Sequence, residues 1–308
     1  MDNKKEKAVV LGSTGNIVYA LANVLIGIKK HSPYLNADFI IFHKDISEND
    51  QQLLNSIIPC KIIEFNFPVE ETEELQKSSF GRYSKLAFSR YECFNLLDEY
   101  KKVVWLDVDI LIQKDISGLF NLCENGIGLF QEEAPLQECF SITVEGYEMT
   151  GAHYNSGVIV LSENLPGYKK YTEWLYNKTL ELGKYLCYAD QGIINLLIQE
   201  FKLDVTNIGE EYNYHPLKRN PNKAKIIHSY SPEKFWHYYN PKYHYREWDK
   251  NYKKWTKMGG SKYIGYVPKP TERIMRTYFP GVPNPIRQTG KFCKYVINSL
   301  LSIKLKEF

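Results

Sequence analysis

The fold is specified most clearly by Val103-Val104-Trp105-Leu106-Asp107-Val108-Asp109-Ile110, an apolar run that ends in two aspartates one residue apart. Alternate side chains of an extended strand point to the same side, so Asp107 and Asp109 can converge while the apolar residues anchor the strand. Two neighbouring carboxylates repel each other, and a shared divalent cation offsets that repulsion. The pattern therefore predicts a metal site. The alternative is a strand end that enters a turn, because Asp is common in turns.

Strands and helices alternate on both sides of this run. Their periodicity predicts strands at 7–11, 39–43, 61–65, 103–106, 127–130, 157–161 and 225–227. It predicts helices at 18–30, 50–58, 79–97, 167–182 and 190–201. Short connections between such elements are typical of an α/β fold with a parallel sheet covered by helices. Ligands of open α/β sheets bind beyond the carboxyl ends of the strands, where Asp107, Asp109 and His228 fall.

Composition describes a globular chain of one large domain or two small ones, with 308 residues of which 44% are hydrophobic and 24% charged. The apolar segment 19–28 is shorter than the roughly 18 residues of a membrane span and follows the turn-like Ser13-Thr14-Gly15-Asn16. We therefore expect a strand, a turn and a helix rather than a signal peptide, and a cytoplasmic protein. The six cysteines are scattered without a C-x-x-C pair, which predicts reduced packing residues and no structural zinc site.

Charge is divided unevenly along the chain. Residues 1–216 hold 19 basic and 31 acidic residues, whereas residues 217–308 hold 20 and 5, giving net charges of −12 and +15. The C-terminal third is therefore expected to meet an anionic partner, such as a phosphorylated substrate, an anionic bilayer or nucleic acid. We do not expect nucleic acid, because no zinc-finger spacing or RNP-like motif is present.

Five short motifs follow one another in a family-specific order. They are Lys85-Leu86, the Trp105–Asp109 segment, Tyr154-Asn155-Ser156-Gly157-Val158, Tyr188-Ala189-Asp190-Gln191, and His228-Ser229-Tyr230-Ser231-Pro232-Glu233-Lys234-Phe235-Trp236. This order resembles the retaining glycosyltransferases of family 8, the group of glycogenin and bacterial lipooligosaccharide galactosyltransferases. The resemblance implies a single GT-A (Rossmann-like) nucleotide-sugar transferase domain over residues 1–258, with a mixed, mostly parallel sheet flanked by helices. A basic, aromatic C-terminal extension, helical in part, would follow over residues 259–308.

The resemblance also implies a metal site. In that family the D-x-D aspartates and the later motif histidine, here Asp107, Asp109 and His228, bind a divalent metal that holds the diphosphate of a nucleotide sugar. An imidazole beside two carboxylates suits a first-row ion, so we expect Mn²⁺, with Mg²⁺ as the second choice. Lys234 would contact the diphosphate and stabilise its developing charge. The alternatives are a hydrogen-bonded core histidine and a solvated lysine.

Donor-sugar contacts are implied for Asn155, Asp190 and Gln191, whose carboxylate and amide groups suit sugar hydroxyls. Asp190 and Gln191 would share the catalytic role with Lys234. The alternatives are a turn at Asn155 and a helix N-cap at Asp190. Lys85 matches a basic family position near the donor. Asn16 matches part of the family's nucleoside-binding segment, which here lacks an aspartate.

The implied reaction moves a hexose from a nucleoside diphosphate sugar (UDP-Glc, UDP-Gal or UDP-GlcNAc) to a glycan or glycolipid acceptor with retention, in polysaccharide or lipopolysaccharide biosynthesis. Gln191 is a poor nucleophile, which favours front-side displacement. The late motif departs from the family at Ser231 and Phe235, where Gly and Pro are usual. Two alternatives are a D-x-D phosphatase of the haloacid dehalogenase type and a protein that binds nucleotide sugar without transferring it.

The C-terminal third offers a second interaction surface. Residues 235–255 interleave aromatic and basic side chains. Further on, one helical face carries Phe292, Tyr295, Val296, Leu300 and Ile303, with Lys291, Lys294 and Lys304 off it. Such a helix either packs on its own domain or attaches the protein to an anionic membrane with a lipid-linked acceptor, at the inner face of the cell membrane.

Overall fold

The computed structural model describes residues 4–269, apart from 71, 83, 125 and 239, and also residue 272. Its main sheet has seven strands in the order β3-β2-β1-β4-β7-β6-β8. Their bounds are β1 (Lys5–Thr14), β2 (Asp38–Lys44), β3 (Cys60–Glu64), β4 (Tyr100–Leu106), β6 (Ile127–Pro135), β7 (Ala152–Ser162) and β8 (Val205–Asn207). Strands β1 to β4 are mutually parallel, β7 is antiparallel to both β4 and β6, and β8 is parallel to β6. The predicted mixed, mostly parallel α/β sheet is confirmed.

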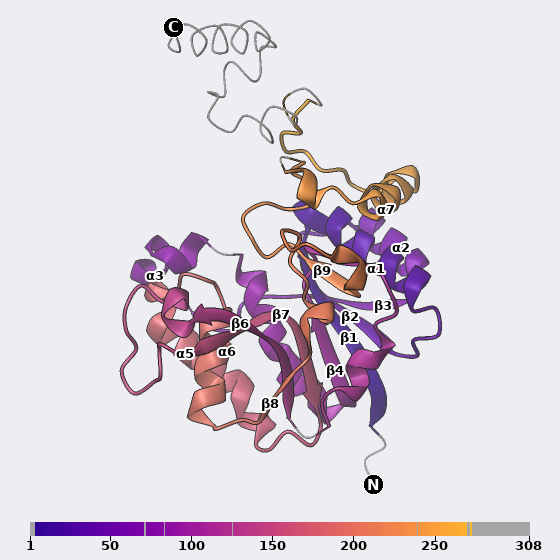
Figure 1. The fold of residues 1–308 in the computed structure, drawn as a ribbon. Coiled ribbons are helices and arrows are strands. Elements are labelled where there is room, and N and C mark those ends of the chain that lie inside the picture. The colour runs from indigo at the N-terminus through magenta and orange to yellow at the C-terminus, as the bar shows by residue number, and fades with distance from the viewer. Residues whose placement is uncertain are drawn as a thin grey trace, which may run out of the picture.

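Helices cover both faces of this sheet (Figure 1). The helices are α1 (Val18–His31), α2 (Glu48–Ile57), α3 (Glu73–Lys77), α4 (Glu92–Asn95), α5 (Tyr171–Leu182), α6 (Gln191–Glu200) and α7 (Arg246–Lys257). Side chains of α1, α2 and α7 share one hydrophobic core, whereas those of α3 to α6 share the other. None of the helices in this described part of the chain combines the length and apolar character that crossing a bilayer requires.

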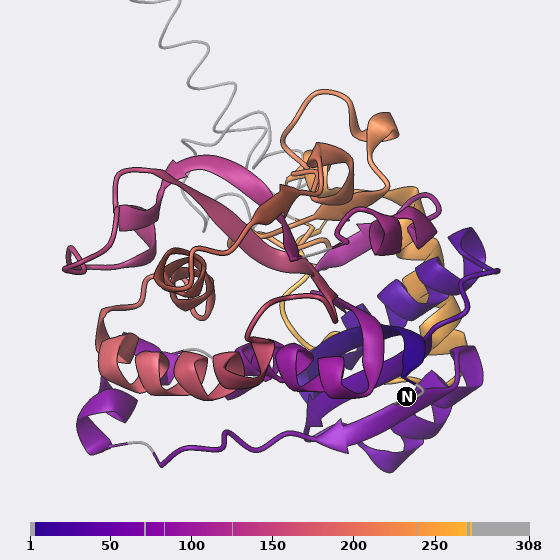
Figure 2. The ribbon, with the colours of Figure 1, turned by 90° about the horizontal axis from the view of Figure 1, so that it is seen from below.

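Helix α7, near the end of the described chain, packs against helix α1 near its beginning. Trp248, Asn251 and Trp255 recur at helical spacing and are buried. The side chain of Asn23 in α1 donates to the backbone oxygen of Trp248 (3.0 Å) and accepts from Asn251 (3.1 Å). In both views α7, in yellow-orange, lies against the indigo N-terminal part of the chain (Figure 1, Figure 2). The aromatic and basic residues of this region therefore form a helix packed on the domain.

One predicted helix is wrong. Residues 79–97 form short 3-10 helices (Ser79–Arg82, Lys85–Tyr91 and Leu96–Asp98) interrupted by α4. The Ser89 hydroxyl donates to the carbonyl of Leu86, and Arg90 Nε donates to the carbonyl of Ala87, so side chains occupy backbone acceptors of this segment. The predicted helix near 291–304, and the function assigned to it, lie outside the described residues.

A small second sheet, β5 (Ile110–Ile112) with β9 (Ile226–His228), stands at the carboxyl end of β4. The two strands are antiparallel, and their register places Ile110 opposite His228. The carboxyl end of β4 faces this pair through the segment Asp107-Val108-Asp109. Residues more than a hundred positions apart are thus brought to one point.

Candidate active site

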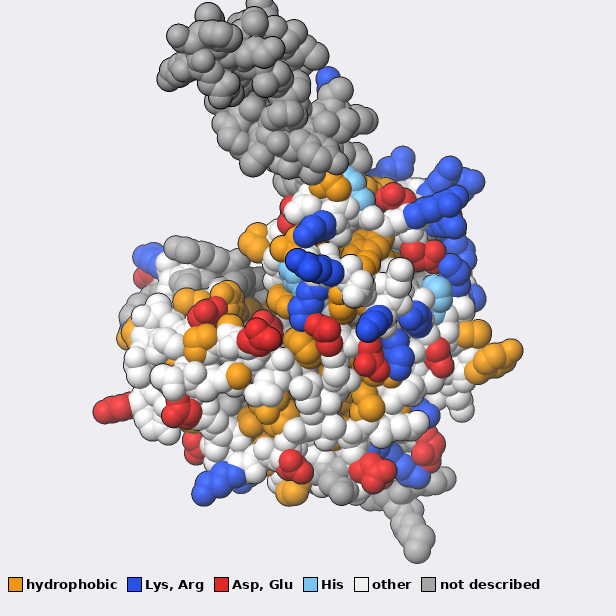
Figure 3. All heavy atoms as spheres, in the orientation of Figure 1, with side chains coloured by type: hydrophobic (Ala, Val, Ile, Leu, Met, Phe, Trp, Pro, Cys, Tyr) orange, Lys and Arg blue, Asp and Glu red, His pale blue; other side chains and the backbone are white. Residues whose placement is uncertain are grey.

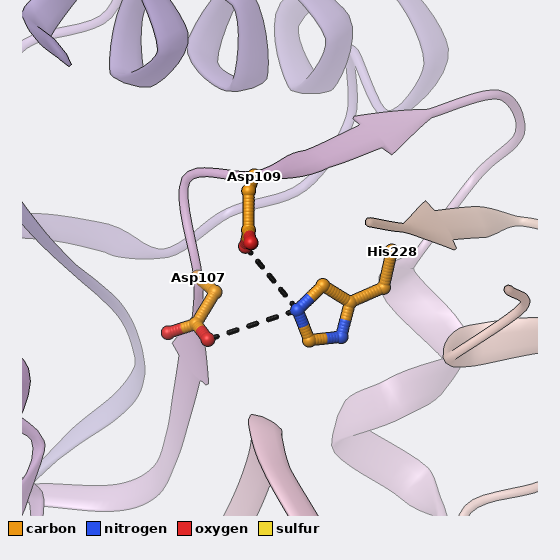
Figure 4. Close-up of side chains that lie close together, drawn as sticks. All are labelled: Asp107, Asp109 and His228. Atoms are coloured by element: carbon orange, nitrogen blue, oxygen red, sulfur yellow. Dashed lines mark ion pairs between the residues drawn. The ribbon is translucent and has the colours of Figure 1, made fainter. Parts of the chain in front are cut away.

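Two aspartates and a histidine meet between the two sheets. One ligand atom from each of Asp107, Asp109 and His228 lies within 4.8 Å of the others. His228 Nε2 is 3.7 Å from Asp107 Oδ2 and 3.2 Å from Asp109 Oδ1 (Figure 4). The expectation that both aspartates belong to an extended strand is wrong, because they lie in a bend between β4 and β5. The bend, rather than strand alternation, aims both carboxylates at the imidazole.

The His228 ring is held on several sides. It is 1% exposed, and the ring of Tyr230 packs edge-on against it with centroids 5.1 Å apart. A Cβ on Gly157 would lie 2.0 Å from His228 Cε1, so only glycine leaves room for the ring. Nδ1 is hydrogen-bonded to Asn213 Oδ1 (2.7 Å), whereas Nε2 is buried without a hydrogen bond and faces the two carboxylates. This donor set fits a divalent first-row ion.

Two cations border the acidic pair. Arg90, 6% exposed, forms ion pairs with Asp107 (2.9 Å) and Asp190 (3.1 Å). Lys234 Nζ lies 2.6 Å from Asp109 Oδ2 and also donates to the backbone oxygen of Ser229 (2.6 Å). The solvated alternative for Lys234 is therefore wrong. Asp190 does hold the N-cap position of the helix that begins at Gln191, as expected, but its side chain makes no capping bond.

Burial and these neighbours shift the acid equilibria in different directions. Burial raises the pKa of Asp107, with Arg90 opposing and Asp109 adding to the rise. Burial alone would also raise the pKa of Asp109, but Lys234 and His228 outweigh it and hold that pKa well below its usual range. Burial raises the pKa of Asp190 to about 6, and Arg90 counters only part of this rise. The charged form is thus disfavoured at Asp107 and Asp190 but stabilised at Asp109 by its cationic neighbours.

The cluster opens into a cavity of about 400 Å³. Its lining includes the predicted residues Asn155, Asp190, Gln191 and Lys234 together with the three clustered residues. Asn155 lies inside β7, so the turn alternative for it is wrong. Two predicted residues line neither this cavity nor the adjoining one of about 220 Å³: Lys85 lies over the ring of Phe80, and exposed Asn16 accepts from the hydroxyl of Thr14.

The family model described as Glycosyl transferase family 8 matches residues 8–240, three quarters of the chain and all of the clustered side chains. The chain belongs to glycosyl transferase family 8. The alternative of a haloacid dehalogenase phosphatase is therefore wrong, and the protein is a glycosyltransferase.

Curated relatives of this family 8 glycosyltransferase are distant. A putative glycosyltransferase of Haemophilus influenzae is 25% identical over 249 residues, covering 70% of this chain and 69% of that protein. The lipopolysaccharide 1,2-glucosyltransferase of Escherichia coli is 23% identical over 209 residues, covering 67% and 61%. The glycosyltransferase GlyE of Streptococcus pneumoniae is 23% identical over 224 residues, covering 70% and 49%. The chain thus spans about half to two thirds of the length of these relatives.

Solved structures agree on the fold. The galactosyltransferase LgtC, in complex with donor and acceptor sugar analogues, superposes with a TM-score of 0.59 at 17% identity, covering 85% of this chain and 98% of that one. GlyE superposes with a TM-score of 0.54 at 17% identity, covering 87% and 67%. The family 8 glycosyltransferase therefore has the GT-A fold that the sequence predicted.

Three side chains of this glycosyltransferase site were not predicted from the sequence. Arg90 joins Asp107 to Asp190, and its only sequence signal is an arginine within the largely apolar and aromatic segment 86–94. Trp105 Nε1, near the end of β4, donates to Asp107 Oδ1 (2.8 Å). Asn213, the partner of His228, lies in a segment without periodicity and gave no signal.

Proposed function

We propose that this family 8 glycosyltransferase moves a hexose from a UDP-sugar to a saccharide acceptor with retention of configuration, using Mn²⁺ or Mg²⁺ held by Asp107, Asp109 and His228. The observation that carries the proposal is the convergence of these three side chains, with an unbonded buried Nε2, on the wall of a cavity. When bound, the metal ion supplies charge neutralisation for a diphosphate leaving group.

The protein's own residues divide the remaining work. Lys234 is the cation of the cavity wall next to Asp109, and we assign it to the diphosphate. Arg90 holds Asp107 and Asp190 in fixed orientations through its two ion pairs. Asp190 would therefore meet sugar hydroxyls as a rigid acceptor, or as a donor when protonated.

Gln191 is oriented by the backbone N–H of Ser156, which donates to its side-chain oxygen (3.2 Å). The NH₂ group of Gln191 is the remaining donor of this side chain and also meets the Cys139 thiol, and an amide is a poor nucleophile. Asn155 shares the same wall of the cavity. This arrangement favours front-side displacement, in which these residues position the donor sugar and no enzyme-bound glycosyl intermediate is needed.

The acceptor would enter a neighbouring cavity of about 310 Å³. This cavity shares Asn155, Gln191 and Tyr230 with the larger one and adds the carboxylates of Glu132 and Glu138. Carboxylates and an aromatic ring suit a saccharide. Because one relative is a lipopolysaccharide glucosyltransferase, we propose a glycan or glycolipid of cell-surface polysaccharide biosynthesis as the acceptor.

Donor and metal can be tested together. Thermal stabilisation and sugar-nucleotide hydrolysis are measured for a panel of UDP-sugars with MnCl₂, MgCl₂ or EDTA. We expect one UDP-sugar to stabilise the protein only with metal present, and Asp109→Asn to abolish the effect. Asp204→Asn, an exposed aspartate far along the chain, serves as the matched control. Donor binding that is equal in EDTA and in Mn²⁺ would contradict the proposal.

The exposed lysines of helix α7 are the basis for proposing an anionic membrane as a partner. Lys250, Lys253, Lys254 and Lys257 recur at helical spacing, are exposed and lie off the buried face of the helix. Blue side chains gather on this side of the molecule (Figure 3). We propose that this lysine face contacts anionic lipid while the acceptor is presented from the bilayer.

The membrane proposal is tested by liposome flotation. Binding to anionic vesicles, absent with neutral vesicles, should weaken with salt and fall when the four α7 lysines become Gln. A matched control replaces the exposed Lys61, Lys169, Lys202 and Lys223 by Gln, an equal change of net charge. Equal loss in both variants would leave no special role for α7.

A further inference from the structure

A line of hydrogen-bonded side chains leads from the metal site to the proposed acceptor cavity. His228 Nδ1 meets Asn213 Oδ1 at 2.7 Å, and Asn213 Nδ2 donates to Asn155 Oδ1 (2.8 Å). Asn155 Nδ2 then donates to Glu132 Oε1 (2.7 Å). His228, Asn213 and Asn155 are 1–2% exposed, so these hydrogen bonds are shielded from bulk solvent.

The donor-to-acceptor direction of these hydrogen bonds is fixed by the backbone N–H of Gly157. The backbone N–H of Gly157 can only donate, and it donates to Asn155 Oδ1 (2.9 Å). The Asn155 amide therefore turns its NH₂ group towards the carboxylate of Glu132, which accepts. Asn155 Oδ1 in turn requires the NH₂ group of Asn213, so Asn213 presents its oxygen to His228. An oxygen at 2.7 Å from Nδ1 requires a proton on Nδ1.

We propose that Asn213 and Asn155 are positioning residues that hold the His228 proton on Nδ1, so that Nε2 keeps its lone pair towards Asp107 and Asp109. Two other effects favour the opposite tautomer, in which the proton is on Nε2. A free imidazole in water favours a proton on Nε2, and the two carboxylates would accept that proton. Reversing the tautomer would place Asn213 Oδ1 against Asn155 Oδ1 or leave the buried Gly157 N–H unpaired.

The consequence for the metal site rests on the proposed function. A metal-binding imidazole must offer an unprotonated nitrogen, and the hydrogen bond at its other nitrogen selects which one it offers. The line of amides therefore prepares the ligand before any ion arrives. Glu132, at its far end, lines the proposed acceptor cavity, so the two cavities share one rigid wall.

The tautomer is measured directly on the full-length, metal-free protein. Histidine is labelled with ¹⁵N, and long-range ¹H–¹⁵N correlations are recorded at about pH 8.5, above the ordinary histidine pKa of about 6.5. His228→Gln assigns the signal by its disappearance. We expect a protonated Nδ1 and an unprotonated Nε2. A proton on Nε2, in the other tautomer or in an imidazolium, would overturn the proposal.

Variants at Asn213 separate positioning from packing. Asn213→Leu keeps the approximate volume but removes the acceptor, so Nδ1–H should be lost and Mn²⁺ binding, followed by EPR of free Mn²⁺, should weaken by about 10- to 100-fold. Asn213→Asp keeps the acceptor oxygen for Nδ1–H but loses the NH₂ group that donates to Asn155, so it should retain the proton on Nδ1 at some cost in stability. Asn222→Leu, at an exposed asparagine, is the matched control and should leave Mn²⁺ binding unchanged.

The outcomes distinguish this proposal from the proposed function. If Nε2 is unprotonated but Mn²⁺ does not bind, the metal assignment fails and the tautomer assignment stands. If Mn²⁺ binds while Nδ1 lacks its proton, the metal assignment stands and the tautomer assignment fails. Should Asn213→Leu not fold, the wild-type spectrum and Asn213→Asp still decide the question.

Discussion

Replacing Arg90 by Met is the most demanding test of the charge balance in this site. The guanidinium is 6% exposed and forms ion pairs at 2.9 Å with Asp107 and at 3.1 Å with Asp190. It also donates to the backbone oxygen (2.6 Å) and the hydroxyl (2.9 Å) of Ser156. Methionine fills a similar space but leaves buried Asp190 and half-buried Asp107 without this cation.

The expected loss follows from that geometry. Removing one partner of a buried ion pair costs about 3–5 kcal/mol, because the other charge stays buried and uncompensated. Whole-domain stabilities are about 5–15 kcal/mol, so Arg90→Met should fold but unfold at a much lower urea concentration. The orphaned carboxylates can take up protons, so their pKa values rise and the loss should be smaller at about pH 5 than at pH 8.

The assay is urea unfolding in EDTA for Arg90→Met, Asp190→Asn and the double variant. The Arg90 substitution should cost less in the Asp190→Asn background, because one carboxylate has already been neutralised. Lys101→Met removes an exposed ion pair with Glu6 and should cost at most about 1 kcal/mol. A loss below about 1 kcal/mol for Arg90→Met at pH 8, or equal losses in both backgrounds, would refute the reasoning.

Three further outcomes follow from single contacts. Gly157→Ala places a Cβ 2.0 Å from His228 Cε1, so we expect a folded protein that is destabilised by about 1–3 kcal/mol. Titration with Mn²⁺ should show weaker binding than in the wild type. Unchanged Mn²⁺ affinity would contradict the close contact between Gly157 and the His228 ring. Burial raises the pKa of Asp190 from 3.8 to about 6, so between these pH values the native state holds a proton that the unfolded state releases. As pH rises through that window, the stability of the wild type relative to Asp190→Asn should fall by up to about 3 kcal/mol, measured by urea unfolding with EDTA. A stability difference that is constant with pH would argue against this prediction. Trp248→Ala should cost about 3–5 kcal/mol in thermal unfolding, since Trp248 is buried and stacks on Phe235 (5.1 Å between centroids), whereas Lys250→Ala on the exposed side of α7 should change little.

Local pattern predicted much of the architecture and part of the site. The sequence pattern located β1, α1, β2, α2 and β3 to within a few residues, because each has five or more residues and β1, α1 and β2 contain continuous apolar runs that are buried. β5 and β8, of three residues each, were not predicted, whereas the equally short β9 was predicted at 225–227. The segment 79–97 misled the prediction, because side-chain bonds from Ser89 and Arg90 to nearby carbonyls accompany 3-10 geometry there.

The sequence by itself determined the α/β fold, the family and the chemical types of the side chains that we propose as metal ligands, since these depend on spacing and residue identity along the chain. The tertiary structure alone decided how these side chains meet. The pairing of β5 with β9 carries His228 to the bend at Asp107 and Asp109, and Arg90 and Asn213 join them from segments without a distinctive motif. Contacts between residues so far apart depend on how the elements pack, and no local periodicity contains that information.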